Sequence, residues 1–314
     1  MEDAIKKITV FGGTGMLGKP VVRELVRAGY DVTVMVRDTG RAASTLPEKV
    51  TLKEGDLTRK KDIMAVLEEA DAVYLNLSTR PDVKKYDSFI PERDGLESVL
   101  SVIAEINSRG AIRGSTQEPE VNGSGPKIKR VASISSLVQR YQGTEGFSWW
   151  VFEIKQWAEK MLKEADVPVT IFYPSSFMET MDQGGILQGR RLMLVGTSRE
   201  PMHFISGSDY GRMVSRAFKL HDRSDQFYDI QGTQALTMED AALEFVKNYR
   251  HGPLKITRVP MWVIKVLGGF NGEVNYLAHF MEALNKYKEP KPDPSVWEKL
   301  GRPRTSLAEY ARRL

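Results

Sequence analysis

The chain has 314 residues, and its 45 Lys and Arg against 41 Asp and Glu give a formal net charge of +4. The lack of Cys excludes disulfide frameworks, cysteine-based zinc sites, iron–sulfur clusters and thiolate nucleophiles. A hydrophobic fraction of 41% with 27% charged residues is typical of a globular protein rather than a disordered one. So mild a positive excess predicts no nucleic-acid partner, since such binding needs clustered Lys and Arg.

Short runs rich in Val, Ile, Leu and Tyr alternate with helical patterns through the first half of the chain. The runs expected to form strands span residues 7–11, 32–36, 50–54, 72–77, 130–134 and 169–173. The patterns expected to form helices span residues 16–28, 60–69, 95–108 and 152–165. Such alternation indicates βαβ units, in which helices cover both faces of a parallel sheet. We therefore expect an α/β protein with a Rossmann-like, doubly wound parallel sheet.

The pattern changes along the second half, which suggests two regions. We expect residues 1–175 to form the Rossmann domain and residues 176–314 a smaller C-terminal region that binds substrate. Residues 203–235, with a helix at 209–220 and a strand at 227–230, are expected to pack back onto the sheet. Residues 108–129 are rich in Gly and Pro and have no apolar period. They predict a surface insertion, with a functional lid as the alternative.

The most informative segment follows the first predicted strand and opens the first predicted helix. It contains a G-x-G-x-x-G motif in Gly13, Gly15 and Gly18, and Gly12 adds an overlapping glycine. In this context glycines allow the backbone to approach a pyrophosphate closely, and the N–H groups of the helix N-terminus attract phosphates. An ordinary strand–helix turn is the alternative. A dinucleotide is expected to contact the whole loop, which consists of Gly12, Gly13, Thr14, Gly15, Met16, Leu17 and Gly18.

The end of the second predicted strand indicates which dinucleotide is bound. An acidic residue there would bind the ribose 2′-OH of NAD, whereas an Arg accommodates the 2′-phosphate of NADP. Arg37 takes the strand-end position and Asp38 follows it, with Arg41 close enough in sequence to assist. A guanidinium can bind a phosphate through two hydrogen bonds. The pattern favours NADP(H) over NAD(H), and Asp38 keeps NAD(H) open.

Polar residues also follow the third and fourth predicted strands, near the expected path of the cofactor. Asp56 and Leu57 follow the third strand, where a carboxylate could accept a hydrogen bond from the adenine amino group. A turn-forming Asp is the alternative for Asp56. Asn76, Leu77 and Ser78 follow the fourth strand. We expect all five residues to contact the cofactor.

Several motifs together resemble the short-chain dehydrogenase/reductase superfamily, and more narrowly its atypical, NmrA-like branch. The resemblance is carried by residues 12–18, 36–38, 55–57, 133–136, Lys155, 172–179, 207–211, 300–303 and 306–307. It implies an NAD(P)-binding Rossmann fold over nearly the whole chain. It also implies that Ser133 and the segment after the sixth strand lie near the cofactor. That segment is Tyr173, Pro174, Ser175, Ser176 and Phe177, with Tyr173 where the branch often has Arg.

The resemblance breaks at the catalytic residues. Typical members use a Ser together with Tyr and Lys spaced Y-x-x-x-K, in which the Lys lowers the pKa of the Tyr that protonates the substrate. The Lys corresponds to Lys155 and the Ser to Ser135 or Ser136, but Val151 stands where the Tyr would be. Lys155 is then a candidate acid and ribose ligand, or else a solvated helix residue. Tyr141 is a candidate substitute acid, with a loop aromatic as the alternative.

These features lead to two functional hypotheses. The first is an NAD(P)H-dependent oxidoreductase that passes hydride from NADPH to an apolar, electron-poor acceptor such as a quinone or enone, whose reduced oxygens water can protonate. The second is an NADP(H)-binding, redox-sensing regulatory or scaffold protein without turnover, which the missing Tyr supports. A sugar-nucleotide epimerase is disfavoured, because that chemistry relies on the missing Tyr.

Other features predict absences and partners. His203, His221, His251 and His279 are scattered, so we expect no metal site. The start of the chain lacks a signal-peptide pattern, which predicts a cytoplasmic protein. The apolar stretch 260–268 is too short to span a bilayer, and we expect a packed helix rather than stable membrane insertion. The expected partner is a small apolar substrate, with a homodimer or a protein partner as further alternatives.

Overall fold

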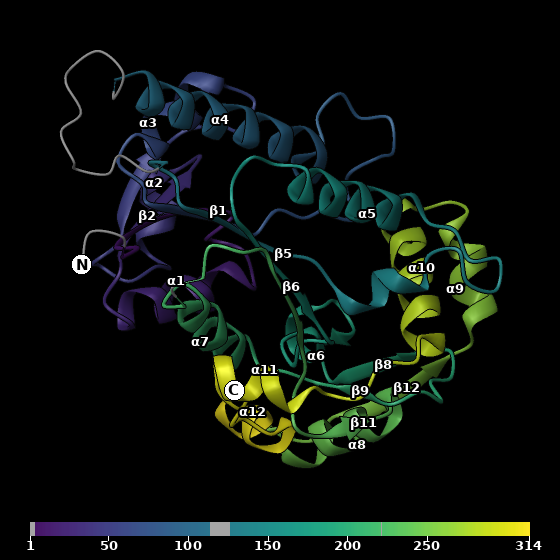
Figure 1. Cartoon of the computed structure of the whole chain (residues 1–314). Helices are drawn as coiled ribbons and strands as arrows, with labels where there is room; N and C mark the ends of the chain where they lie inside the picture. The colour runs from purple at the N-terminus through teal and green to yellow at the C-terminus, as the bar shows by residue number, and fades with distance from the viewer. Residues whose placement is uncertain (1–3, 114–125, 221) are drawn as a thin grey trace.

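The computed structural model describes residues 4–113, 126–220 and 222–314. Within these ranges seven parallel strands form the main sheet in the order β10-β6-β5-β4-β1-β2-β3 (Figure 1). The strands are β1 (Lys7–Phe11), β2 (Asp31–Val36), β3 (Thr51–Glu54), β4 (Ala72–Leu75), β5 (Arg130–Ile134), β6 (Val169–Pro174) and β10 (Gln226–Ile230). The chain winds outward from β1 in both directions, so β1 and β4 lie side by side at the reversal of strand order.

Helices cover both faces of the sheet. On one face lie α1 (Gly18–Arg27), α7 (Gly207–Ala217) and α11 (Pro294–Leu300), and on the other α3 (Lys60–Leu67), α4 (Leu96–Arg113) and α5 (Trp150–Lys163) (Figure 1). The central strands between them are buried on both sides; β4, for example, is buried at every residue, whereas the edge strand β3 is exposed or half-buried. The Tyr74 and Tyr210 hydroxyls hydrogen-bond at 2.9 Å and tie β4 to α7 inside this core. The short helix α2 (Thr39–Ala43) follows β2.

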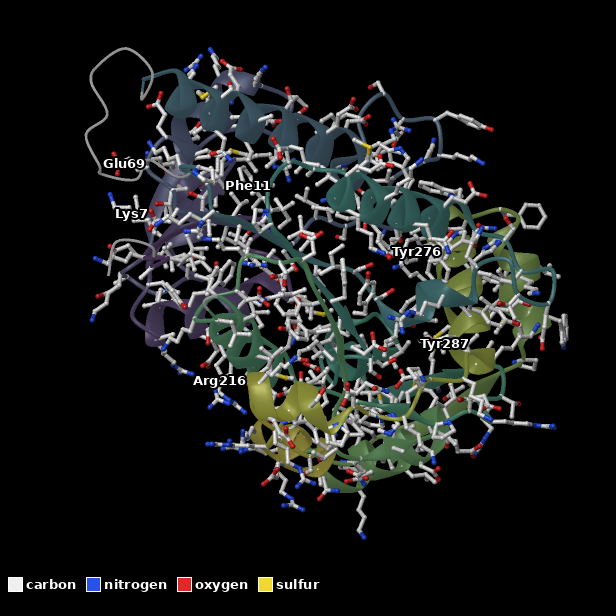
Figure 2. The ribbon with its side chains drawn as sticks, in the orientation of Figure 1. Lys7, Phe11, Glu69, Arg216, Tyr276 and Tyr287 are labelled. Atoms are coloured by element: carbon white, nitrogen blue, oxygen red, sulfur yellow. The ribbon has the colours of Figure 1, made fainter. Side chains whose placement is uncertain are left out.

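The C-terminal part builds a second core against the end of α5. Its strands are β7 (Leu187–Gln188), β8 (Arg191–Val195) and β12 (Lys255–Val259) in one sheet and β9 (Met202–His203) and β11 (Ala235–Leu236) in another. Its helices are α6 (Thr180–Gln183), α8 (Met238–Asn248), α9 (Met261–Gly268), α10 (Gly272–Lys286) and α12 (Leu307–Arg313). Trp149 and Phe152 pack with Phe245 and Met281 in this core. Figure 2 shows Tyr276 of α10 beside α5, with Tyr287 at the far end of α10.

The predicted fold class is confirmed, because the sheet is parallel and covered on both faces. The expected strand at 227–230 is β10, which pairs with β6. Helix α4 continues past residue 108, where the sequence predicts its end, to Arg113. An i,i+4 ion pair of Glu105 and Arg109 supports this extra turn. Residues 114–125 of the expected insertion lie outside the described residues, and the division of the chain at residue 175 stays a prediction.

The apolar stretch 260–268 forms α9, which buries one face and exposes apolar side chains on the other. Ile264 is buried, whereas Trp262 is 69% exposed and Val266 and Leu267 are also exposed. The predicted helix is therefore present and packs against α10, but only one of its faces is buried, since α9 lies on the outside of α10 (Figure 1). Across the described ranges, no helix combines the length and apolar character that crossing a membrane requires.

Candidate functional site

A cleft of about 730 Å³ opens at the carboxyl ends of β1 to β5. Ligands of open α/β sheets bind at this edge, where the strand order reverses. The structure brings thirteen of the predicted site residues to its wall. They are Gly12, Thr14, Gly15, Met16, Leu17, Arg37, Asp56, Leu57, Asn76, Leu77, Ser78, Ser135 and Lys155. Residues from five separate strand ends therefore meet around one cavity.

The glycine loop is packed so closely that side chains are excluded at three positions. Gly12 has a φ of +77°, and a Cβ there would collide with the Asn76 carbonyl. A Cβ at Gly13 would lie 2.7 Å from Cγ1 of Val34, and one at Gly18 would collide with the Gly12 carbonyl. Gly13 and Gly18 thus serve the packing of loop, strand and helix, while Gly12 and Gly15 line the cleft. This geometry lets the backbone itself form the cleft wall.

The start of α1 is open toward the cleft. Its N-cap residue is Leu17, whose side chain makes no capping hydrogen bond. The N–H of Lys19 donates to the Gly15 carbonyl at 3.1 Å and Pro20 has no N–H, so the N–H of Gly18 is the first-turn donor left for a ligand among the described residues. Asn76 donates a hydrogen bond from Nδ2 to the Gly12 carbonyl at 3.2 Å, which fixes its amide beside the loop. The buried Oδ1 of Asn76 has no hydrogen-bond partner within the described part of the chain. A free backbone N–H at a helix N-terminus suits a phosphate, and an unpaired buried acceptor suits a ligand that donates a hydrogen bond.

Arg37 and Asp38 take different roles. Arg37 is exposed at the end of β2 and lines the cleft. Asp38 is the N-cap of α2, and its Oδ1 accepts the backbone N–H of Arg41 at 2.9 Å. Its carboxylate is thus engaged in helix capping, and it is not among the cleft-lining residues. The guanidinium is the charged group that β2 presents to a ligand.

Asp56 lines the cleft and also forms a turn. Its Oδ1 accepts the backbone N–H and the hydroxyl of Thr58, both at 2.8 Å. These two hydrogen bonds are the main reason that the pKa of Asp56 is lowered. Asp56 therefore forms the turn that the sequence offers as the alternative, and it also lines the cleft.

Lys155 reaches the cleft from α5 and is held by a residue that the sequence did not indicate. Its Nζ lies 2.6 Å from Oε1 of Glu92, and the two side chains are 15% and 7% exposed. Val151, in the place of the expected Tyr one turn earlier, is 1% exposed and belongs to the C-terminal core. The interpretation of Lys155 as a solvated helix residue is therefore wrong.

The geometry of this cleft agrees with a family match. A protein-family model described as NAD(P)H-binding covers residues 12–200, which is more than half of the chain and includes the glycine loop. The chain belongs to the NAD(P)H-binding family. The glycine loop, the open N-terminus of α1 and the cleft wall apart from Phe11 all fall within the matched range.

Individual proteins resemble this NAD(P)H-binding chain over most of its length. It is 23% identical over 267 residues to photosystem II assembly factor Ycf39 of Synechocystis sp., covering 84% of this chain and 74% of that protein. It is 23% identical over 314 residues to NAD(P)H azoreductase of Xenophilus azovorans, covering 97% and 96%. An NADPH-dependent quinone oxidoreductase of Escherichia coli matches its structure with a TM-score of 0.69 at 16% identity, covering 98% of both chains. The last likeness shows the fold that the two chains share.

The other predicted residues of the NAD(P)H-binding site lie away from the cleft wall. Besides Gly13 and Gly18 they are Ser133, Tyr141, Tyr173, Pro174, Ser175, Ser176 and Phe177. The Tyr141 hydroxyl donates to Glu145 at 3.0 Å, and burial together with this bond raises its pKa to about 12. Arg140 lies 4.8 Å above the Tyr173 ring while pairing with Asp229.

The segment after β6 contacts the C-terminal part instead. Ser175 donates from Oγ to Glu289 at 2.6 Å, and the Ser176 hydroxyl contacts the sulfur of Met202 at 3.2 Å. Phe177 packs edge-on against Tyr210. Contacts of this segment with a cofactor stay a prediction.

Sequence reasoning missed part of the cleft wall. The missed residues are Phe11, Met35, Val36, Gly55, Thr58, Arg80, Asp82, Val83, Asp87, Phe89, Pro91 and Ile134. Some of them lie at strand ends directly beside residues that the sequence did predict, and these neighbours could have indicated them. The others belong to the segment from Arg80 to Pro91, for which composition and periodicity give no signal. Among the residues that the structure describes, no three His, Asp or Glu side chains gather as a metal would require, and His221 lies outside them.

Proposed function

We propose that the chain is an NADPH-dependent oxidoreductase of the NmrA-like kind, which reduces an apolar, electron-poor acceptor such as a quinone or enone. The observation that carries the choice of cofactor is the division of roles after β2. Arg37 lines the cleft, whereas the carboxylate of Asp38 caps α2. A guanidinium at this position suits a 2′-phosphate. The azoreductase and the quinone oxidoreductase, by their names, use NAD(P)H and NADPH.

The residues of the cleft fit a bound dinucleotide. The backbone of residues 12–18 and the N-terminus of α1 would hold the pyrophosphate, and Arg37 the 2′-phosphate. Lys155 and Asn76 would hold the nicotinamide ribose and neighbouring groups through an ammonium donor and an amide acceptor. When bound, the reduced nicotinamide supplies a hydride to the acceptor.

The chain itself contributes the orientation of the acceptor at the reacting end. Ile134, next to Ser135, and Pro91, next to the Lys155 partner Glu92, give this cleft an apolar wall near Ser135 and Lys155. Such a wall favours an apolar acceptor and holds it against the donor. With Val151 in the place of the expected Tyr, no phenol of the described residues hydrogen-bonds Lys155, so an acceptor whose reduced oxygens are protonated by water suits the site.

A second candidate is an NADP(H)-binding regulatory or scaffold protein without turnover. The burial of Val151 favours it, because the site lacks the usual proton donor. The similarity to an assembly factor also supports it. In this case the protein would act in the cytoplasm through a protein partner, with an affinity for that partner that depends on the bound nucleotide.

Turnover distinguishes the two candidates. The test is NADPH oxidation, followed at the nicotinamide absorbance band, with a panel of quinones, enones and azo compounds. The reductase predicts acceptor-dependent oxidation by the wild-type chain and strong loss of it in Lys155→Met. Tight NADPH binding without oxidation on any member of the panel would contradict the reductase and favour the scaffold.

A further inference from the structure

A buried ion pair joins α5 to the turn that precedes α4. Lys155 Nζ and Glu92 Oε1 are 2.6 Å apart, and Glu92 lies in a π-helical turn, Pro91–Gly95. The two residues are 63 positions apart in sequence. π-helical turns are rare and occur frequently at functional sites. The carboxylate therefore contacts the one charged α5 side chain that lines the cleft in the described structure.

The Glu92 carboxylate is fixed from its other side as well. Its Oε2 accepts the backbone N–H of Thr79 at 3.0 Å and the Thr79 hydroxyl at 2.9 Å. Thr79 is 2% exposed and follows Ser78, which lines the cleft. Both carboxylate oxygens are thus engaged, so the anion has a fixed position before any ligand arrives. Tyr276 of α10 is a further titratable group near it, since the charge of Glu92 contributes to the raised pKa of Tyr276, after burial.

We propose that Glu92 is a positioning residue for Lys155, a role that rests on the proposed binding of NADPH. An ammonium has three N–H donors. Glu92 takes one of them and leaves two for hydroxyl groups of a ligand in the cleft. The carboxylate also balances a charge that would otherwise be costly at 15% exposure. In members with Y-x-x-x-K, a Tyr is the partner of the Lys; here Glu92, held in turn by Thr79, orients it through a direct ion pair.

The test is a double-mutant cycle on NADPH affinity with Glu92→Gln and Lys155→Met. Glu92→Gln should raise the NADPH dissociation constant about ten-fold, because a neutral amide holds the ammonium less firmly. In the Lys155→Met background the same change should raise it less than about two-fold, because the interaction is already lost. Glu153→Gln is the matched control, since Glu153 is an exposed residue of α5 paired with Lys85 and should leave the affinity unchanged.

Thr79→Val provides an independent arm if Glu92→Gln fails to fold, as judged by circular dichroism. It removes one hydroxyl donor to Glu92 and should raise the dissociation constant about two- to three-fold. Wild-type affinity in Glu92→Gln, or an equal loss with and without Lys155, would overturn the positioning role. Failure of the wild-type chain to bind NADPH would instead overturn the proposed function, and the wild-type titration shows this before any variant is made.

Discussion

Glu179 gives a prediction of pH-dependent stability that follows from one buried carboxyl group. The residue is 9% exposed, its Oε1 accepts the N–H of Gly207 at 2.8 Å, and its buried Oε2 has no partner among the described residues. Burial raises the pKa of Glu179 to about 7, against an opposing effect of the Gly207 hydrogen bond. We therefore expect Glu179→Gln to stabilise the protein at alkaline pH relative to the wild type.

The sign and size of this pH effect follow from the pKa values of Glu179 in the folded and the unfolded state. Because the folded state binds the proton more tightly than the unfolded state, this contribution to stability is complete below pH 4.5, the ordinary value, and is lost as the pH rises through about 7. At about 1.4 kcal/mol per pKa unit, the loss is on the order of 3 kcal/mol. About 2.5 kcal/mol of it falls between about pH 5 and about pH 8.5.

Urea unfolding at these two pH values measures the effect. The free energy of unfolding of Glu179→Gln minus that of the wild type should increase by about 2.5 kcal/mol from the lower to the higher pH. Glu68→Gln, at an exposed position after α3, should show no such increase. A difference between Glu179→Gln and wild type that is the same at both pH values would contradict a raised pKa for Glu179.

Two further variants test the loop and the packing of α7. Gly12→Ala should lower the melting temperature and abolish NADPH binding, because its Cβ meets the Asn76 carbonyl. Its control is Gly29→Ala, at a φ of +90° with open space, which should reduce the free energy of unfolding by about 1 kcal/mol and leave NADPH binding intact. Asp209→Asn should reduce the free energy of urea unfolding by about 3 kcal/mol, since this fully buried carboxylate pairs with Arg212 and accepts two backbone N–H groups. Asp240→Asn, at an exposed position, should reduce the free energy of unfolding by less than about 1 kcal/mol. Equal effects of Gly12→Ala and Gly29→Ala on NADPH binding, or of Asp209→Asn and Asp240→Asn on the free energy of unfolding, would contradict these explanations.

The sheet and the phosphate loop could be predicted because their signals are local. Buried parallel strands are short apolar runs, and Gly18 is required by the close approach of the Gly12 carbonyl within one strand–turn–helix unit, while Gly12 itself has a positive φ. The role of Asp38 was also within reach, since Asp directly before a helix is a preferred N-cap. Its capping bond removes much of the ambiguity that the sequence leaves between two cofactors.

The partner of Lys155 could not be predicted, because it depends on tertiary structure. Glu92 precedes Lys155 by 63 positions, and its π-helical turn has no sequence pattern that we could use. The wall formed by the segment from Arg80 to Pro91 depends in the same way on how a loop folds over the sheet edge. The exposed face of α9 was also missed, because an apolar run does not reveal whether another element covers it.

The most direct test of the account is a fluorescence titration of wild type, Arg37→Ala and Arg41→Ala with NADPH and with NADH. The wild type should bind NADPH at least about ten-fold more tightly than NADH, because Arg37 binds the 2′-phosphate. Arg37→Ala should remove this preference by weakening NADPH alone, whereas Arg41→Ala, outside the cleft wall, should change it little. An equal loss for both nucleotides in Arg37→Ala, or no nucleotide binding by the wild type, would contradict the account.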